Sequence, residues 1–168
     1  MKVFTEEQRL PRWKLFLITG FLISLMVFLC IKFLEATIDK KAAVIMLVSI
    51  LIYALLIVFV FKVKLASKIN EQGIYYRFFP LHFKERFIPW NDLGKVFIRK
   101  YNPVLEYGGW GVRLNYYRKR GRAFNVSGNI GLQLILKNGK KILIGTHKEY
   151  EMKQVLSTYK DKIKTDGS

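Results

Sequence analysis

The stretch AAVIMLVSILIYALLIVFVF, residues 42–61, contains 20 residues and no charged side chain. At about 1.5 Å per residue, a helix of this length spans roughly 30 Å, the thickness of the hydrocarbon core of a bilayer. A second uncharged run, LFLITGFLISLMVFLCI, occupies residues 15–31. Neither run has a polar face, which argues against two buried helices of a soluble protein. The sequence therefore predicts two transmembrane helices, over about residues 13–34 and 42–62.

The alternative interpretation of the first run is a cleaved signal peptide. Basic residues precede the run, but it is too long for a signal peptide and no small-residue cleavage site follows it. Trp13 and Lys14 stand at its start, as residues that anchor a helix at the membrane interface often do. Lys32, near its other end, is able to extend its side chain towards the interface. We therefore expect a helix that stays in the membrane.

The connector between the two runs, residues 32–41, is short enough to predict an antiparallel helical hairpin with both chain ends on one side. Basic residues are more numerous beside the two chain ends than in the connector. They are Lys2, Arg9, Arg12 and Lys14 before the first helix, and Lys62, Lys64 and Lys68 after the second. The two helices predict a multi-pass protein of the cell (inner) membrane, and cytoplasmic segments of such proteins carry the excess of Lys and Arg. Both termini would be cytoplasmic, with residues 1–12 as an N-terminal tail.

Composition supports this division of the chain. The protein has 168 residues, of which 51% are hydrophobic, yet its formal net charge is +17. Residues 66–168 hold 20 Lys and Arg against 8 Asp and Glu, so the apolar and basic parts of the chain are separate. The single cysteine, Cys30, lies in the first predicted helix and excludes an internal disulfide. We expect it to be a packing or lipid-facing residue.

After residue 61 the pattern changes to short β-rich segments separated by turn residues. We expect eight strands, over residues 65–70, 74–79, 84–88, 95–101, 112–117, 123–126, 132–136 and 141–144. A helix of about 15 residues should follow, because five apolar residues lie on one helical face. These are Met152, Val155, Leu156, Tyr159 and Ile163. Thr146 and Glu149 have the spacing of a capping box at its start.

Two stretches in this region are informative: IPWNDLGKV, residues 88–96, and LKNGKKILIGTHKEYE, residues 136–151. The first resembles a strand–turn–strand joint of the bacterial pleckstrin-homology-like (bPH) domain, and the second resembles the closing hairpin and helix start of that family. Over residues 12–162 the chain is similar to bacterial membrane proteins that carry two membrane helices before such a domain. The resemblance implies a membrane α-hairpin plus an α+β domain over residues 63–163, followed by a short tail, 164–168. That domain would be an antiparallel PH-like half-barrel of seven or eight strands, capped by a C-terminal amphipathic helix. These motifs are structural and not catalytic.

The glycine-rich stretch YGGWGVR, residues 107–113, has two interpretations: a cradle for a phosphate, or a sharp bend of the backbone. No Lys-Ser or Lys-Thr pair follows, which excludes a P-loop, and no dinucleotide-binding fingerprint is present. We therefore expect a bend at the start of a strand, after a loop over residues 102–107, with Trp110 packed over bare backbone. Trp110 and Arg113 stay as a candidate ligand-contact surface.

Catalytic and metal-binding patterns are weak. Neither His82 nor His147 has a second ligand at metal-binding spacing. Ser127, His147 and Asp92 would imitate a catalytic triad, but no nucleophile elbow is present, and no carboxylate pair is placed for acid–base work. The sequence predicts no catalytic residue, no metal, no cofactor and no enzyme activity.

The basic excess is the strongest functional feature. Its densest cluster is Arg118, Lys119, Arg120 and Arg122, on a predicted hairpin tip around Gly121. Each Lys or Arg near an anionic leaflet contributes about 1 kcal/mol of attraction. The alternative interpretation of the basic excess is a surface that contacts only solvent. No nucleic-acid motif is present. We expect a non-catalytic protein whose PH-like domain binds anionic lipid head groups or an acidic membrane-associated protein. The second hypothesis is an accessory subunit of a membrane enzyme or transporter complex. Oligomeric state is not predicted.

Overall fold

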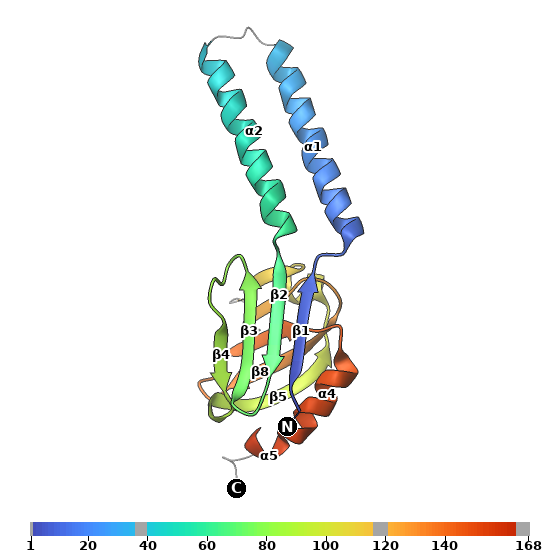
Figure 1. Ribbon diagram of the computed structural model, residues 1–168, viewed down its shortest axis with the longest axis vertical. Helices are drawn as coiled ribbons and strands as arrows, with labels where there is room; N and C mark the ends of the chain where they lie inside the picture. The colour runs from blue at the N-terminus through green and yellow to red at the C-terminus, as the bar shows by residue number, and fades with distance from the viewer. Residues whose placement is uncertain (1, 36–39, 116–120, 164–168) are drawn as a thin grey trace. The chain divides into compact units, whose positions relative to one another are not determined.

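The computed structural model describes residues 2–35, 40–115 and 121–163, and the chain divides into two compact units (Figure 1). One unit is Leu10–Val63. The other combines Met1–Arg9 with Lys64–Ser168. The first residues of the chain therefore belong to the same unit as its long C-terminal part.

The smaller unit consists of helices α1 (Arg12–Glu35) and α2 (Lys40–Phe61), which lie side by side (Figure 1). Within them, Arg12–Phe33 and Ala43–Phe61 are long and apolar enough to cross a membrane. Neither span is buried inside the protein, so large apolar side chains are exposed along both helices. The predicted pair of long apolar helices is thus present, over nearly the predicted residues.

The larger unit begins with a four-stranded antiparallel sheet. Its strands are β1 (Phe4–Arg9), β2 (Lys64–Ile69), β3 (Gly73–Phe79) and β4 (Arg86–Pro89), in the order β1-β2-β3-β4. Alternate residues of these strands face the core. Phe4 is opposite Ile69, which is opposite Ile74, and all three side chains are buried.

Strand β1 corrects the expectation that residues 1–12 form a tail. Phe4, Glu6 and Gln8 are its buried positions, and two of these three residues are polar. The sequence FTEEQR therefore lacks the apolar alternation by which strands are normally predicted. Its partner β2 lies more than 50 residues later in the chain, which local patterns do not reveal.

A five-stranded sheet follows. Its strands are β5 (Leu93–Lys100), β6 (Gly111–Asn115), β7 (Gly121–Asn125), β8 (Ile130–Leu136) and β9 (Lys141–Gly145), in the order β5-β8-β9-β7-β6. Strands β7 and β9 are parallel and the other pairs are antiparallel. Because β5 and β8 pair directly, the β6–β7 hairpin is an insertion that joins the sheet beside β9.

This arrangement differs from the expected fully antiparallel half-barrel of seven or eight strands. The residues that the structure describes form nine strands, and one of their pairings is parallel. The eight expected strands each correspond to one of β2 to β9, and β1 is the addition.

The C-terminal segment forms α4 (Glu149–Thr158) and α5 (Lys160–Ile163), which lie close to β1 and β5 respectively (Figure 1). Met152, Val155, Leu156 and Tyr159 are buried, as their spacing predicts. The Tyr159 ring lies 5.3 Å from that of Trp90, in the 3-10 turn Trp90–Asp92. The predicted capping box is wrong: Lys148 occupies the N-cap and no side chain caps the helix. The Thr146 hydroxyl donates to Glu6 and accepts from the Lys148 backbone N–H at 3.0 Å.

Candidate interaction surface

The insertion between β5 and β8 begins with a short helix, α3 (Pro103–Tyr107), where a loop was expected. The side-chain oxygen of Asn102 accepts hydrogen bonds from the backbone N–H groups of Val104 and Leu105, at 3.1 and 3.0 Å. Pro103 occupies the first helical position, where its missing N–H costs nothing. An Asn N-cap followed by Pro at N1 is a recognised helix start, so this element was detectable from the sequence.

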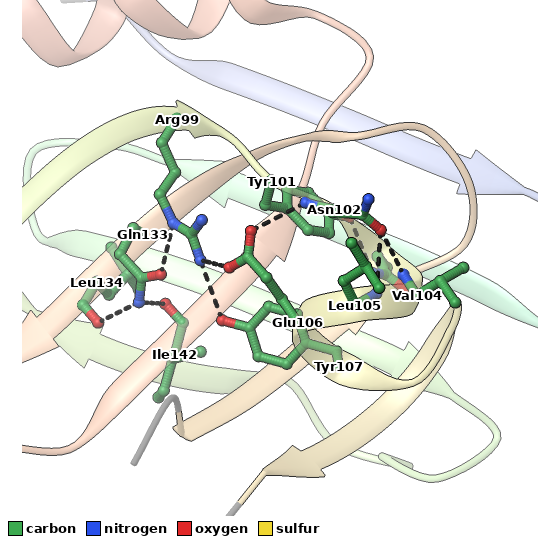
Figure 2. A network of polar contacts seen from close by, with 11 residues as sticks. Arg99, Tyr101, Asn102, Val104, Leu105, Glu106, Tyr107, Gln133, Leu134 and Ile142 are labelled. Carbon is green, nitrogen blue, oxygen red and sulfur yellow. Dashed lines mark hydrogen bonds and ion pairs between the residues drawn. The ribbon is translucent and has the colours of Figure 1, made fainter. Parts of the chain in front are cut away.

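A polar network holds α3 against the second sheet (Figure 2). Its centre is Arg99 of β5, which donates to the Glu106 carboxylate at 2.8 Å and to the Tyr107 hydroxyl at 3.3 Å. Arg99 Nε also donates to Gln133 Oε1 of β8, at 3.1 Å. The other carboxylate oxygen of Glu106 accepts from the backbone N–H of Asn102 at 2.9 Å. Two strands and both ends of α3 are therefore tied together.

The ion pair at the centre of the network is partly buried. Burial lowers the pKa of Arg99, but the hydrogen bond and the charge of Glu106 outweigh burial and raise this pKa. The guanidinium therefore keeps its charge. Removing one member of such a pair leaves a partly desolvated charge without its counter-ion, which is costly. The pair thus favours a single position of α3.

A small second core lies beneath the network. It consists of Tyr101, Tyr107, Ala123 and Leu143. The fully buried Asn125 side chain joins it, because its amide donates to the Tyr101 hydroxyl at 2.8 Å and its carbonyl accepts from Gly111 N–H at 2.8 Å. Burial raises the pKa of Tyr101 to about 12, so this hydroxyl stays neutral at physiological pH. These contacts fix the point where β6 begins.

Three large apolar side chains are exposed on this fixed segment. Val104, Leu105 and Trp110 have exposed fractions of 57%, 69% and 41%. We call these three residues the α3 surface. Apolar side chains that are concentrated on a well-held segment mark interaction sites more often than isolated ones do. Trp110 was expected on a contact surface from the sequence, whereas Val104 and Leu105 were not, because they lay in an expected loop.

Trp110 and Arg113, the predicted pair, lie together. The Trp110 indole N–H donates to the Gly128 carbonyl at 3.0 Å, and Arg113 Nε donates to the Trp110 carbonyl at 3.1 Å. Gly109 and Gly111 have φ angles of +122° and +106°, which residues with a side chain rarely adopt. The glycines therefore serve the backbone bend, and this geometry favours the structural interpretation of YGGWGVR.

The predicted basic cluster is described only at one position. Arg118, Lys119 and Arg120 lie outside the described residues. Arg122 is exposed on β7, opposite Leu114 of β6, and the two strands pair as far as Asn115 and Gly121.

The residues that imitate a catalytic triad come together only in part. Ser127 Oγ lies 3.0 Å from His147 Nε2. The carboxylate beside them belongs to Glu6, not Asp92, and it accepts from the backbone N–H of His147 at 2.8 Å and from the Thr146 hydroxyl at 2.6 Å. A carboxylate that binds the backbone does not orient the imidazole as a triad acid does. Glu6 is thus a buried link between β1 and the β9–α4 junction.

Among the described residues, no group of three or more His, Cys, Asp or Glu side chains could hold a metal ion. A hollow of about 350 Å³ on the first sheet is lined by Glu7, Ala66, Lys68 and Tyr75, among others. Its walls mix acidic, basic and apolar side chains.

Comparison with family models, with curated proteins and with solved structures found no match to this chain.

Proposed function

We propose that this is a non-catalytic integral membrane protein, multi-pass in the cell (inner) membrane. A PH-like domain on the cytoplasmic side would bind an acidic membrane-associated protein through the α3 surface. The observation that carries the proposal is the exposure of Val104, Leu105 and Trp110 on a segment that the Arg99–Glu106 network holds in place.

The pairing of β1 with β2 supports the membrane topology. Strand β1 precedes α1 and β2 follows α2, yet they pair over six residues, from Phe4 opposite Ile69 to Arg9 opposite Lys64. Strands can pair in this way only on one side of a membrane, so the chain between them crosses an even number of times. The excess of Lys and Arg beside both strands favours the cytoplasmic side.

The order of elements supports a PH-like fold with an insertion. The first sheet is a four-stranded antiparallel meander, and β5, β8 and β9 form a second antiparallel set that leads into α4. The inserted α3, β6 and β7 account for the parallel pair of β7 with β9.

Charge favours an acidic partner. Residues 66–168 carry 20 basic and 8 acidic residues, and exposed Lys100 and Arg113 flank the α3 surface in the sequence. An apolar centre with basic neighbours fits an apolar patch with acidic neighbours. If the partner is an enzyme or transporter, the protein is an accessory subunit of that complex.

The test is photo-crosslinking of the full-length protein in cells. A photoreactive amino acid is placed at Leu105 or, as the control, at Tyr150, an exposed aromatic residue of α4. We expect one defined protein adduct from position 105 that position 150 does not form. Leu105→Ser should lower copurification of that same protein at least tenfold, whereas Tyr150→Ser should not. Equal adducts from both positions, or unchanged copurification with Leu105→Ser, would overturn the proposal.

A further inference from the structure

The loop between β3 and β4, residues 80–85, exposes two large apolar side chains, Leu81 and Phe83. Phe83 is 79% exposed, the highest fraction of any large apolar side chain in the described chain, and Leu81 is 59% exposed. Neither residue belongs to the α3 surface, which lies on the other sheet. The β3–β4 loop is therefore a second exposed apolar feature of the domain, and the proposed function gives it no role.

His82, between these two residues, turns inward and holds the loop. Its backbone N–H donates to the Phe78 carbonyl at 2.7 Å, and its Nδ1 accepts from the Phe78 N–H at 3.4 Å. Its ring centroid lies 5.9 Å from that of Tyr76 and 5.2 Å from that of Phe124. The Phe83 ring meets Phe79 edge-on at 6.0 Å. The outward direction of Leu81 and Phe83 thus belongs to a well-held conformation.

The register of the first sheet shows at which end this loop lies. Phe79, which ends β3, is opposite Lys64 of β2, and Lys64 is opposite Arg9 of β1. Two residues separate Arg9 from the start of α1, and two separate the end of α2 from Lys64. Three residue steps reach at most about 10 Å. The loop therefore lies at the sheet end that is tethered to both apolar helices, and the β2–β3 turn lies at the opposite end, about 20 Å away.

Basic residues accompany the apolar ones. Lys84 and Arg86 are exposed, with Glu85 between them. Exposed Phe and Leu beside Lys and Arg are typical of segments that enter the headgroup region of an anionic membrane, about 5–10 Å deep. Two-residue linkers join this end of the sheet to α1 and α2, so the bilayer that these helices would enter is the occupant whose chemistry fits the loop.

We propose that the β3–β4 loop docks onto the lipid bilayer, with Leu81 and Phe83 in the headgroup–acyl boundary and Lys84 and Arg86 at anionic head groups. This inference rests on the proposed membrane anchoring by α1 and α2. It adds a lipid contact that is separate from the α3 surface and from the basic cluster at residues 118–122.

The experiment uses the full-length protein in nanodiscs of phosphatidylcholine and phosphatidylglycerol. An environment-sensitive fluorophore is attached to a single cysteine, either at Phe83→Cys or at Glu71→Cys in a Cys30→Ala background. Glu71 is exposed in the β2–β3 turn, at the opposite end of the sheet. A third sample carries the label on the natural Cys30, inside α1.

We expect nitroxide-bearing lipid to quench the label at position 83 at least twofold more than the label at position 71, and aqueous iodide to show the reverse order. Equal quenching at both positions, with the Cys30 label in contact with lipid, would overturn the docking of the loop and leave the anchoring intact. A Cys30 label that iodide quenches and lipid does not would overturn both.

Discussion

His82 links the exposed β3–β4 loop to the interior of the domain. Its ring packs beside Tyr76 and Phe124, and its Nδ1 accepts a hydrogen bond from the Phe78 N–H. Burial lowers the pKa of His82 first, and the positive charges of Arg86 and Arg122 lower it further. A protonated ring would lose its acceptor at Nδ1 and face two cations, so the folded protein favours neutral imidazole.

The first prediction concerns stability against pH. In the unfolded chain the pKa of histidine is about 6.5. Because the pKa of His82 is lower in the folded state, the unfolded chain binds more protons between the two values, and stability falls as the pH drops through this window. The loss approaches about 1.4 kcal/mol per unit of pKa difference.

Thermal unfolding in detergent at about pH 7.5 and about pH 5.5 measures this effect. His82→Asn keeps an acceptor near Phe78 N–H but does not titrate, so it should show a smaller fall in midpoint than the wild type. His147→Asn is the matched control. Its thermal midpoint should still show the part of the fall between the two pH values that the protonation of His82 causes. A wild-type dependence that His82→Asn leaves unchanged would contradict the prediction.

At the scale of elements, β1 is held by side chains as well as by its pairing with β2. Glu6 accepts from the Thr146 hydroxyl and the His147 N–H, and Gln8 donates to the Gly145 carbonyl at 2.7 Å. These residues occupy the inward positions of the strand, where they replace the usual apolar contacts. The N-terminal strand is thereby tied to the end of β9, on the second sheet.

The second prediction separates the two neighbouring glutamates of β1. Glu6→Ala leaves the buried Thr146 hydroxyl and the partly buried His147 N–H without their acceptor, so it should lower the free energy of unfolding by about 1–3 kcal/mol. Glu7 is more exposed and pairs with Arg9 and Lys64 at 2.8 and 3.0 Å. These surface pairs lower the pKa of Glu7, but Glu7→Ala should cost at most about 1 kcal/mol. Thermal midpoints of both variants test this, and an equal or larger loss for Glu7→Ala would contradict it.

The whole molecule is organised by one non-local pairing. Strand β1 joins a sheet whose other strands begin after α2, so the apolar hairpin is inserted into the β domain between its first two strands. A membrane hairpin whose two ends enter one sheet has both ends on the same side. In the proposed topology that side is the cytoplasm, because Lys and Arg flank the helices there.

The third prediction therefore concerns topology. Enzymatic reporters that are active on only one side of the membrane, fused before Met1 or after Ser168, should both indicate the cytoplasm. Because β1 and β2 have to meet, the two fusions should always agree with each other. Opposite locations of the two reporters would show that β1 and β2 do not pair in the membrane-inserted protein. A periplasmic location of both reporters would reverse only the proposed orientation.

Local patterns determine several features of this protein. The uncharged runs at residues 15–31 and 42–61 are enough to predict two long apolar helices, because runs of this length and composition are typical of helices that can span a bilayer. The eight expected strands match β2 to β9 because their residues are mostly β-branched, aromatic or aliphatic between turn residues. Trp110 and Arg113 were identified because both lie in the glycine-rich stretch YGGWGVR, residues 107–113. The positive φ angles of Gly109 and Gly111 explain why this stretch requires glycine.

Other features depend on contacts between distant residues, and only the tertiary structure decides them. Strand β1 is a strand because β2 is beside it and because Thr146 and His147 supply donors to Glu6, which no pattern within FTEEQR reveals. The parallel pairing of β7 with β9 arises because β5 and β8 pair directly and displace the inserted hairpin to the sheet edge. Leu81 and Phe83 are exposed because His82 takes the inward position between them. A sequence lists these residues as neighbours, but which of them faces the core depends on what packs against the loop.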